Sequence, residues 1–213
     1  MPYLKKVIPA PEPVDCRILT AALDLFVNRG FHNVSIHDVQ KQAEVSIGSI
    51  YNHFGGKEGI AKALYEHLLI EMQDLVDCAI RDKDTAIERC NEIISQLFSY
   101  TETHRNIISY IFHPRHNEFL TDEPPICNSS PFLTIRNIIQ QGMDSGEIKQ
   151  HNLWVASAAI YGGPIRMINL RLDNIIEQPL PELQEEIMES VWQGMLGENA
   201  EMKSGNKLKL VKT

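Results

Sequence analysis

The sequence of 213 residues lacks the marks of several specialised classes of protein. Its four cysteines are scattered and form no C-x-x-C pair, so we expect reduced thiols that mostly pack in the core, with redox sensing as the weaker alternative. No run reaches the roughly 18 apolar residues of a membrane span. No apolar segment follows Lys5 and Lys6, as it would in a signal peptide. We therefore expect a cytoplasmic protein with no membrane partner.

Catalytic signatures are also missing. The sequence has no nucleophile motif, no phosphate-binding glycine loop and no paired-carboxylate pattern, so we expect neither an enzyme nor a cofactor. His113 and His116, with His104 and Glu118 nearby, are a weak candidate for a metal cluster. Histidines in a loop interrupted by proline more often serve as solvated or capping groups, and we expect no metal.

The net charge of −8 is unevenly spread. Residues 1–60 hold six basic and six acidic residues, whereas the rest of the chain carries 14 basic against 22 acidic ones. An acidic surface repels polyanions, so a surface for nucleic acid is expected near the N-terminus.

Apolar residues recur at helical spacing and strand-like alternation is scarce, which predicts an all-α fold of about nine helices. The expected helices are 13–29, 35–43, 46–54, 57–78, 84–103, 105–112, 131–142, 152–172 and 181–195, with a loop at 113–130. The expected domains are an N-terminal arm (1–12), a helix-turn-helix domain (13–58), a larger helical domain (59–200) and a flexible basic tail (201–213).

The first helices have clear end signals. Gly30 ends the first helix, because glycine readily adopts a positive φ. Ser35 and Asp38 have the spacing of a capping box, and Ser46 offers a second N-cap only three residues after Ala43. A connection this short between two helices is the geometry of a helix-turn-helix.

The helix from Ser46 suits a DNA duplex on its outer face. Ile50 and Phe54 point inward at i, i+4, which leaves the outer face to Ile47, Gly48, Ser49, Tyr51, Asn52 and His53. Hydroxyl groups can reach phosphates, while amide and imidazole groups can reach base edges. The alternative is a polar face that only contacts solvent.

These residues resemble the TetR-type transcriptional regulators. The string Ser46-x-Gly48-x-Ile50-Tyr51-x-x-Phe54-x-x-Lys57-Glu58 lies on the expected helix-turn-helix, and the resemblance covers residues 15–65. It implies DNA contacts from Ser35, His37, Ser46, Ile47, Gly48, Ser49, Tyr51, Asn52, His53 and Lys57.

Three positions depart from the family pattern. His37 stands where arginine is frequent, Ile47 where lysine is common, and Glu44 where the turn usually has glycine. Glu44 costs roughly 1 kcal/mol if it adopts a left-handed conformation. Fewer charged contacts imply a shallower salt dependence of DNA binding.

The resemblance also implies a dimer through 152–172 and 181–195, and a small hydrophobic or amphipathic effector within the larger domain. One stripe of the first segment holds Trp154, Ala158, Tyr161, Ile165 and Ile168; one stripe of the second holds Leu183, Ile187, Val191 and Met195. Candidate effector contacts are Tyr100, His104, Tyr110, Phe112, Phe132, Trp154, Tyr161 and Arg166, although such residues more often form core. Pro164 should kink or break its helix.

The leading hypothesis is a homodimeric DNA-binding regulator, a repressor that a small effector releases from a palindromic operator. One alternative is an architectural DNA-binding protein that a protein partner controls without an effector. The other is a helical interaction protein that does not bind DNA.

Overall fold

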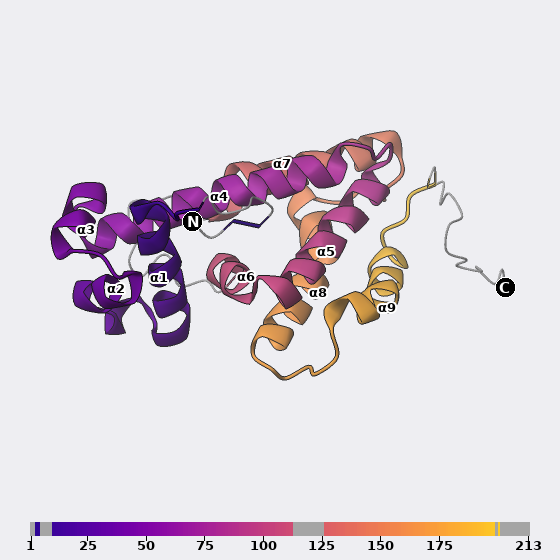
Figure 1. Ribbon diagram of the computed structural model, residues 1–213. Coiled ribbons are helices and arrows are strands. Elements are labelled where there is room, and N and C mark those ends of the chain that lie inside the picture. The colour runs from indigo at the N-terminus through magenta and orange to yellow at the C-terminus, as the bar shows by residue number, and fades with distance from the viewer. Residues whose placement is uncertain (1–2, 5–9, 113–125, 199, 201–213) are drawn as a thin grey trace. The chain divides into compact units, whose positions relative to one another are not determined.

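The structure is a computed structural model that describes residues 3–4, 10–112, 126–198 and 200. These residues form nine α-helices and two short 3-10 helices, and they contain no strand beyond an isolated bridge between Ile148 and Leu196. The expected all-α fold is confirmed (Figure 1). None of the helices in the described ranges is long and apolar enough to cross a membrane. The expected basic tail and most of the 113–130 loop lie outside the described residues.

The chain divides into two compact units, which interleave along the sequence. The first unit holds residues 1–77 and 100–133, and the second holds residues 78–99 and 134–213. The division follows contacts rather than chain order, so α4, α5 and α7 each contribute to both units. The sequence-based domain limits of 13–58 and 59–200 remain a prediction.

In the first unit, the N-terminal helices pack around a small apolar core (Figure 1). The elements are α1 (Val14–Arg29), the 3-10 helix η1 (Phe31–Asn33), α2 (Ile36–Ala43), α3 (Ile47–Phe54), α4 (Lys57–Ile80) and α6 (Arg105–Phe112). Helix α1 contacts α2, α3 and α6, and it buries Ile18, Ala22 and Leu25. We call residues 14–60, from α1 through the first turn of α4, the head.

The second unit is built mainly from four helices. They are α5 (Ala86–Thr103) and α7 (Ser130–Ser145), each in part, with α8 (Leu153–Leu172) and α9 (Leu180–Trp192), which pack on each other. The Trp192 indole N–H donates to Asn91 Oδ1 at 2.6 Å, so this contact joins α9 to α5. Glu147 Oε2 accepts the Ala86 N–H at 2.7 Å, and this contact caps the start of α5 from 61 residues away.

Several sequence expectations need correction. Of the kink or break expected at Pro164, the break does not occur, because α8 continues through this residue. Helix α9 ends at Trp192, which leaves Met195 outside the helix, and residues Ile126–Asn128 of the expected loop form the 3-10 helix η3.

Only half of the cysteines pack in the core. Cys16 and Cys90 are buried, whereas Cys78 and Cys127 are exposed, and no disulfide links them. Burial raises the pKa of the Cys90 thiol to about 12, so this group stays protonated and inert.

Candidate nucleic-acid interface

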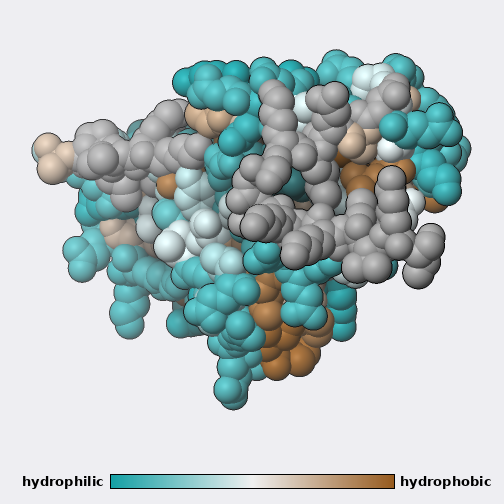
Figure 2. All heavy atoms as spheres, turned by 90° about the vertical axis from the view of Figure 1, so that its right-hand side faces the viewer, coloured by the Kyte–Doolittle hydropathy of each residue, from teal (hydrophilic) through white to brown (hydrophobic). Residues whose placement is uncertain are grey.

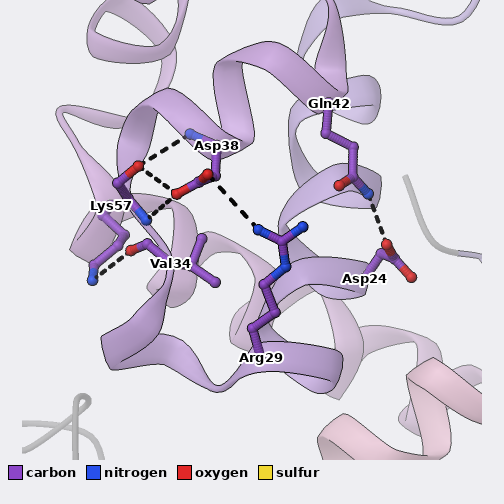
Figure 3. Close-up of polar contacts among 7 residues, drawn as sticks. Asp24, Arg29, Val34, Asp38, Gln42 and Lys57 are labelled. Atoms are coloured by element: carbon purple, nitrogen blue, oxygen red, sulfur yellow. Dashed lines mark hydrogen bonds and ion pairs between the residues drawn. The ribbon is translucent and has the colours of Figure 1, made fainter.

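The first turn of α2 is held by a reciprocal cap. The Asp38 N–H donates to Ser35 Oγ at 3.2 Å, and the Ser35 N–H donates to Asp38 Oδ2 at 2.8 Å (Figure 3). The side-chain and backbone hydrogen bonds from Ser35 lower the pKa of Asp38, and Arg29 lies 3.8 Å from its carboxylate. The predicted capping box is confirmed. Ser35 and His37 remain exposed at this end of α2, where the helix dipole favours an anion.

The turn between α2 and α3 carries the expected backbone strain. Glu44 has φ 53° and ψ 48°, which is the left-handed conformation. Arg17 Nη1 donates to the Glu44 carbonyl at 3.4 Å and so supports the turn from α1. A residue with a Cβ costs roughly 1 kcal/mol there relative to glycine.

Helix α3 presents the expected outer face. Ser46 caps the helix, because its Oγ accepts the Ser49 N–H at 3.0 Å, and Ile50 is fully buried. The exposed fraction of Tyr51 is 54%, so its aromatic ring and hydroxyl stand in solvent. The remaining outward positions are exposed at Ser46, Gly48, Asn52 and His53 and half-buried at Ile47 and Ser49. This face is polar, capped at its start and open to a partner.

Lys57 has contacts that the sequence did not predict. Its ammonium group donates to the Val34 carbonyl at 2.9 Å (Figure 3). It also donates to the Phe31 carbonyl at 3.1 Å and lies 4.2 Å from the centroid of the Phe31 ring. The group is half-buried and faces the segment that leads into α2.

Two further residues of the head escaped sequence analysis. A Cβ on Gly59 would lie 1.7 Å from the Phe54 carbonyl oxygen, so α3 and α4 approach too closely for any other residue. Asp24 accepts hydrogen bonds from Gln42 at 2.8 Å and Asn106 at 3.1 Å, which joins α1 to α2 and α6. The sequence signal for Gly59 was a glycine inside the predicted helix 57–78. The contacts of Asp24 span 18 and 82 residues, and no local sequence pattern reveals them.

Five of the candidate effector residues fall in the first unit, and the structure brings four of them together in pairs. The rings of Tyr100 and His104 meet edge to face at 5.3 Å between centroids, and those of Phe112 and Phe132 at 6.4 Å. Partial burial lowers the pKa of His104. The Tyr110 hydroxyl donates to the Ala61 carbonyl at 3.4 Å, and burial raises its pKa.

The other three candidates lie in the second unit in different surroundings. Trp154 is 58% exposed and lies under the Arg136 guanidinium at 4.6 Å, and Arg166 is also exposed. Tyr161 is buried, and its hydroxyl faces the Cys90 thiol, a weak hydrogen-bond partner that leaves the oxygen without a full hydrogen bond. Burial raises the pKa of Tyr161 first, with Cys90 adding to the shift.

Metal binding finds no support in the part of the chain that the structure describes, where no group of three or more histidine, cysteine or acidic side chains could hold an ion. His113, His116 and Glu118, the weak metal candidates, lie outside it.

A capped helix-turn-helix with an open polar face on its second helix defines a class, the helix-turn-helix transcriptional regulators. Residues 18–64 match the family model described as bacterial regulatory proteins, tetR family. This region therefore resembles the DNA-binding domain of that family, and the relative that matches most of the chain is a regulator protein.

Similar proteins extend the likeness beyond the head. The fatty acid metabolism regulator protein of Bacillus subtilis is 25% identical over 86% of this chain and 96% of its own length. The solved structure of the transcriptional regulator FadR from Bacillus subtilis in complex with stearoyl-CoA is 26% identical, covers 84% of this chain and 97% of that one, and has a TM-score of 0.73. A TetR family regulator from Marinobacter aquaeolei VT8 has a TM-score of 0.74 at 18% identity, covering 86% and 96% of the two chains, and shows the shared fold.

Proposed function

We propose that this protein is a homodimeric repressor that binds a palindromic operator and leaves it when a long-chain acyl-CoA, or a similar amphipathic molecule, binds. The observation that carries the DNA-binding part is the outer face of α3, with Tyr51 and Asn52 exposed on a helix whose ends are both capped. As a DNA-bound regulator of a bacterial family, it would act in the cytoplasm.

In this proposal, α3 enters the major groove and α2 contacts the backbone. Asn52 and His53 read base edges, Ile47 contacts a thymine methyl group or a sugar, and Gly48 lets the helix approach the groove closely. The phosphate contacts come from hydroxyl groups and from the N-terminus of α2, namely Ser35, His37, Ser46, Ser49 and Tyr51. These are mostly uncharged contacts, so the salt dependence of binding should be shallow.

Dimerisation is supported by an exposed stripe on α8. The outward residues are Val155, Ala158, Ala159, Gly162, Gly163 and Arg166. A Cβ on Gly162 or Gly163 would meet nothing within 4 Å, so these glycines leave open space on this chain's own surface. Small side chains at this spacing let a second helix approach closely, and two-fold symmetry would supply the second half-site about one helical turn away.

The apolar surface agrees with this assignment. Figure 2 shows some hydrophobic residues at the surface among mostly hydrophilic ones. Trp154 and Val155 on α8, together with Ile175 just beyond it, rank among the large apolar side chains that stand exposed. Exposed apolar groups that gather on one helix often mark an interface.

The effector assignment rests on two supports. The Tyr161 hydroxyl is a buried polar group with only a thiol beside it, which suits a ligand that brings a hydrogen-bonding atom to it. A relative at 26% identity was solved in complex with stearoyl-CoA. Effector binding would act by favouring a conformation whose two heads no longer match the half-sites.

Selection of bound duplexes from random DNA tests the DNA-binding part. We expect a recovered palindrome, and we expect Tyr51→Ala to weaken binding to it by about tenfold or more while the dimer stays folded. Ile70→Ala, which removes another exposed apolar side chain outside this face, is the control and should bind normally. Recovery of no sequence, or equal binding by Tyr51→Ala, would count against the proposal.

The oligomeric part has its own test. Gly162→Leu places a side chain in open space on the subunit and in the way of a partner, so sedimentation should show a folded monomer. Gly48→Leu, at a helical glycine where a Cβ would meet only Ser46 Oγ at 3.7 Å, should remain dimeric. A dimeric Gly162→Leu variant would contradict the α8 interface.

For the effector part, displacement from the selected duplex would be followed with stearoyl-CoA, with shorter acyl-CoA esters and with CoA alone. We expect release by the long-chain ester and none by CoA, with Tyr161→Phe weakening the response. If no acyl-CoA changes either DNA affinity or the melting temperature, the acyl-CoA assignment fails while the DNA-binding part stands.

A further inference from the structure

The ammonium group of Lys57 is engaged inside the head. It has three N–H donors, of which two reach the carbonyls of Val34 and Phe31 at 2.9 and 3.1 Å. The ammonium group also lies 4.2 Å from the centroid of the Phe31 ring, within the range of a cation–π contact. Two of its three donors are therefore already engaged within the head, and the charge also lies close to an aromatic ring.

These contacts fix the entry to α2. Val34 directly precedes Ser35, the N-cap of α2, and its carbonyl accepts from Lys57. The Phe31 ring is buried and packs edge to face on Phe26 of α1 at 5.2 Å between centroids. Lys57 therefore joins the start of α4 to the buried ring of Phe31 and to the residue before the α2 cap.

The same turn of α4 also sets the position of α3. Gly59, two residues after Lys57, lies so close to the Phe54 carbonyl that even a methyl group would clash. One turn of one helix thus places both DNA-facing elements, with Lys57 acting on α2 and Gly59 acting on α3.

We propose that Lys57 is a positioning residue, which orients the capped N-terminus of α2 toward the DNA backbone and does not itself bind phosphate. The inference rests on the proposed DNA-binding function and revises the phosphate contact that the family resemblance implied for Lys57. Its charge is used within the head, because hydrogen bonds from an ammonium group to two carbonyls are stronger than those between neutral groups. Phosphates would then meet α2 at Ser35 and His37.

Nuclear magnetic resonance on the unmodified protein gives the first test. Scalar couplings across hydrogen bonds, from Lys57 Nζ to the carbonyl carbons of Val34 and Phe31, should be measurable in the free protein. They should persist when the selected duplex is added. Loss of both couplings on DNA binding, or a new contact from Nζ to a phosphorus atom, would overturn the proposal.

Variants supply the second test. Lys57→Met keeps the aliphatic stem and removes the donors, and Lys41→Met removes an exposed lysine of α2 as the matched control. In the DNA-free protein, Lys57→Met should lower the hydrogen-exchange protection of the Asp38 and Val39 amides about tenfold, and Lys41→Met should not. Lys57→Arg, which can donate to both carbonyls, should restore part of the protection.

The dependence of DNA affinity on salt separates positioning from phosphate binding. A lost phosphate contact reduces the slope of log K against log salt by about one per contact, whereas a misplaced α2 lowers affinity at every salt concentration. We expect Lys57→Met to bind about tenfold more weakly with its slope unchanged. A reduced slope with normal amide protection would overturn the proposal.

Failure of the proposed DNA-binding function can be distinguished from failure of the Lys57 proposal. If the unmodified protein bound no duplex, the DNA-binding proposal would fall, while the couplings and amide protection of the free protein would still decide whether Lys57 holds α2.

Discussion

The head and the second unit are stabilised by contacts of different range along the chain. In the head, Ser35 caps α2 through Asp38 and Ser46 caps α3 through Ser49, so each start is set within three residues. In the second unit, the start of α5 is capped in part by Glu147, and α9 is joined to α5 through Trp192 and Asn91, 101 residues apart. The comparison shows that α2 and α3 begin on caps within three residues, whereas α5 adds a distant acceptor, Glu147, to its own local cap from Thr85 and Glu88.

The largest loss of stability is expected at Gly59, where α3 and α4 of the head approach each other closely. Gly59→Ala should destabilise the protein by about 3 kcal/mol and abolish operator binding, because the new methyl group meets the Phe54 carbonyl. Urea unfolding and duplex binding would measure the two effects. Gly48→Ala is the matched control: its Cβ has ordinary space, so stability should rise by about 0.5–1 kcal/mol. A stable Gly59→Ala variant would show that α3 is not held at this point.

A local and a remote cap can be compared directly. Ser35→Ala should cost about 1 kcal/mol, and Glu147→Ala about 1–2 kcal/mol, since the second leaves the first amides of α5 without their distant acceptor. Hydrogen exchange would localise each loss. Ser35→Ala should affect α2 and operator binding, and Glu147→Ala should affect only α5. Loss of α2 protection in Glu147→Ala would show that the two regions are not independent.

Much of the head was predictable because its signals are local. The capping box, the Ser46 cap and the end of α1 at Gly30 all depend on residues within one turn of each other. The contacts of Lys57 span 23 and 26 residues, and periodicity carries no information about them. The fold class and the outward face of α3 therefore followed from the sequence, while the internal role of Lys57 did not.

In the second unit, periodicity predicted the helices but not their faces. Trp154, Ala158 and Tyr161 were expected on one stripe, yet Trp154 and Ala158 are exposed and Tyr161 is buried. Helix α8 is apolar nearly all round, so sequence alone does not show which face meets its own chain. The capping box of Thr85 and Glu88 at the start of α5 was a readable signal that went unnoticed.

A smaller change in stability is expected when glycine replaces either of two residues that have positive φ, Glu44 and Asn174. Glu44→Gly in the head should gain about 0.5–1 kcal/mol, because glycine adopts φ 53° without strain. Asn174→Gly, at φ 57° in the second unit, should gain less, since asparagine tolerates this conformation. Thermal unfolding of both variants measures the difference. Equal gains would mean that the strain at Glu44 is relieved by its neighbours, such as Arg17.

The smallest expected effect is the contribution of Asp38 to the pH dependence of stability. The pKa of Asp38 is held below its usual 3.8 by hydrogen bonds from Ser35, so its stabilising contribution is complete above 3.8. That contribution is lost as the pH falls through the lower value of the folded state. Asp38→Asn should therefore weaken α2 at neutral pH and flatten the acid side of the stability curve, which urea unfolding at several acidic pH values would measure. Asp82→Asn, at an exposed site of the second unit, should leave the curve unchanged.

The distribution of thiols gives the protein two natural attachment sites. Cys78 belongs to the second unit and Cys127 to the first, and both are exposed, while Cys16 and Cys90 are buried. Spin labels would therefore react at one position in each unit of the unmodified chain. The separation between the paired labels, recorded with and without stearoyl-CoA, would show whether this ligand changes it, without any engineered cysteine.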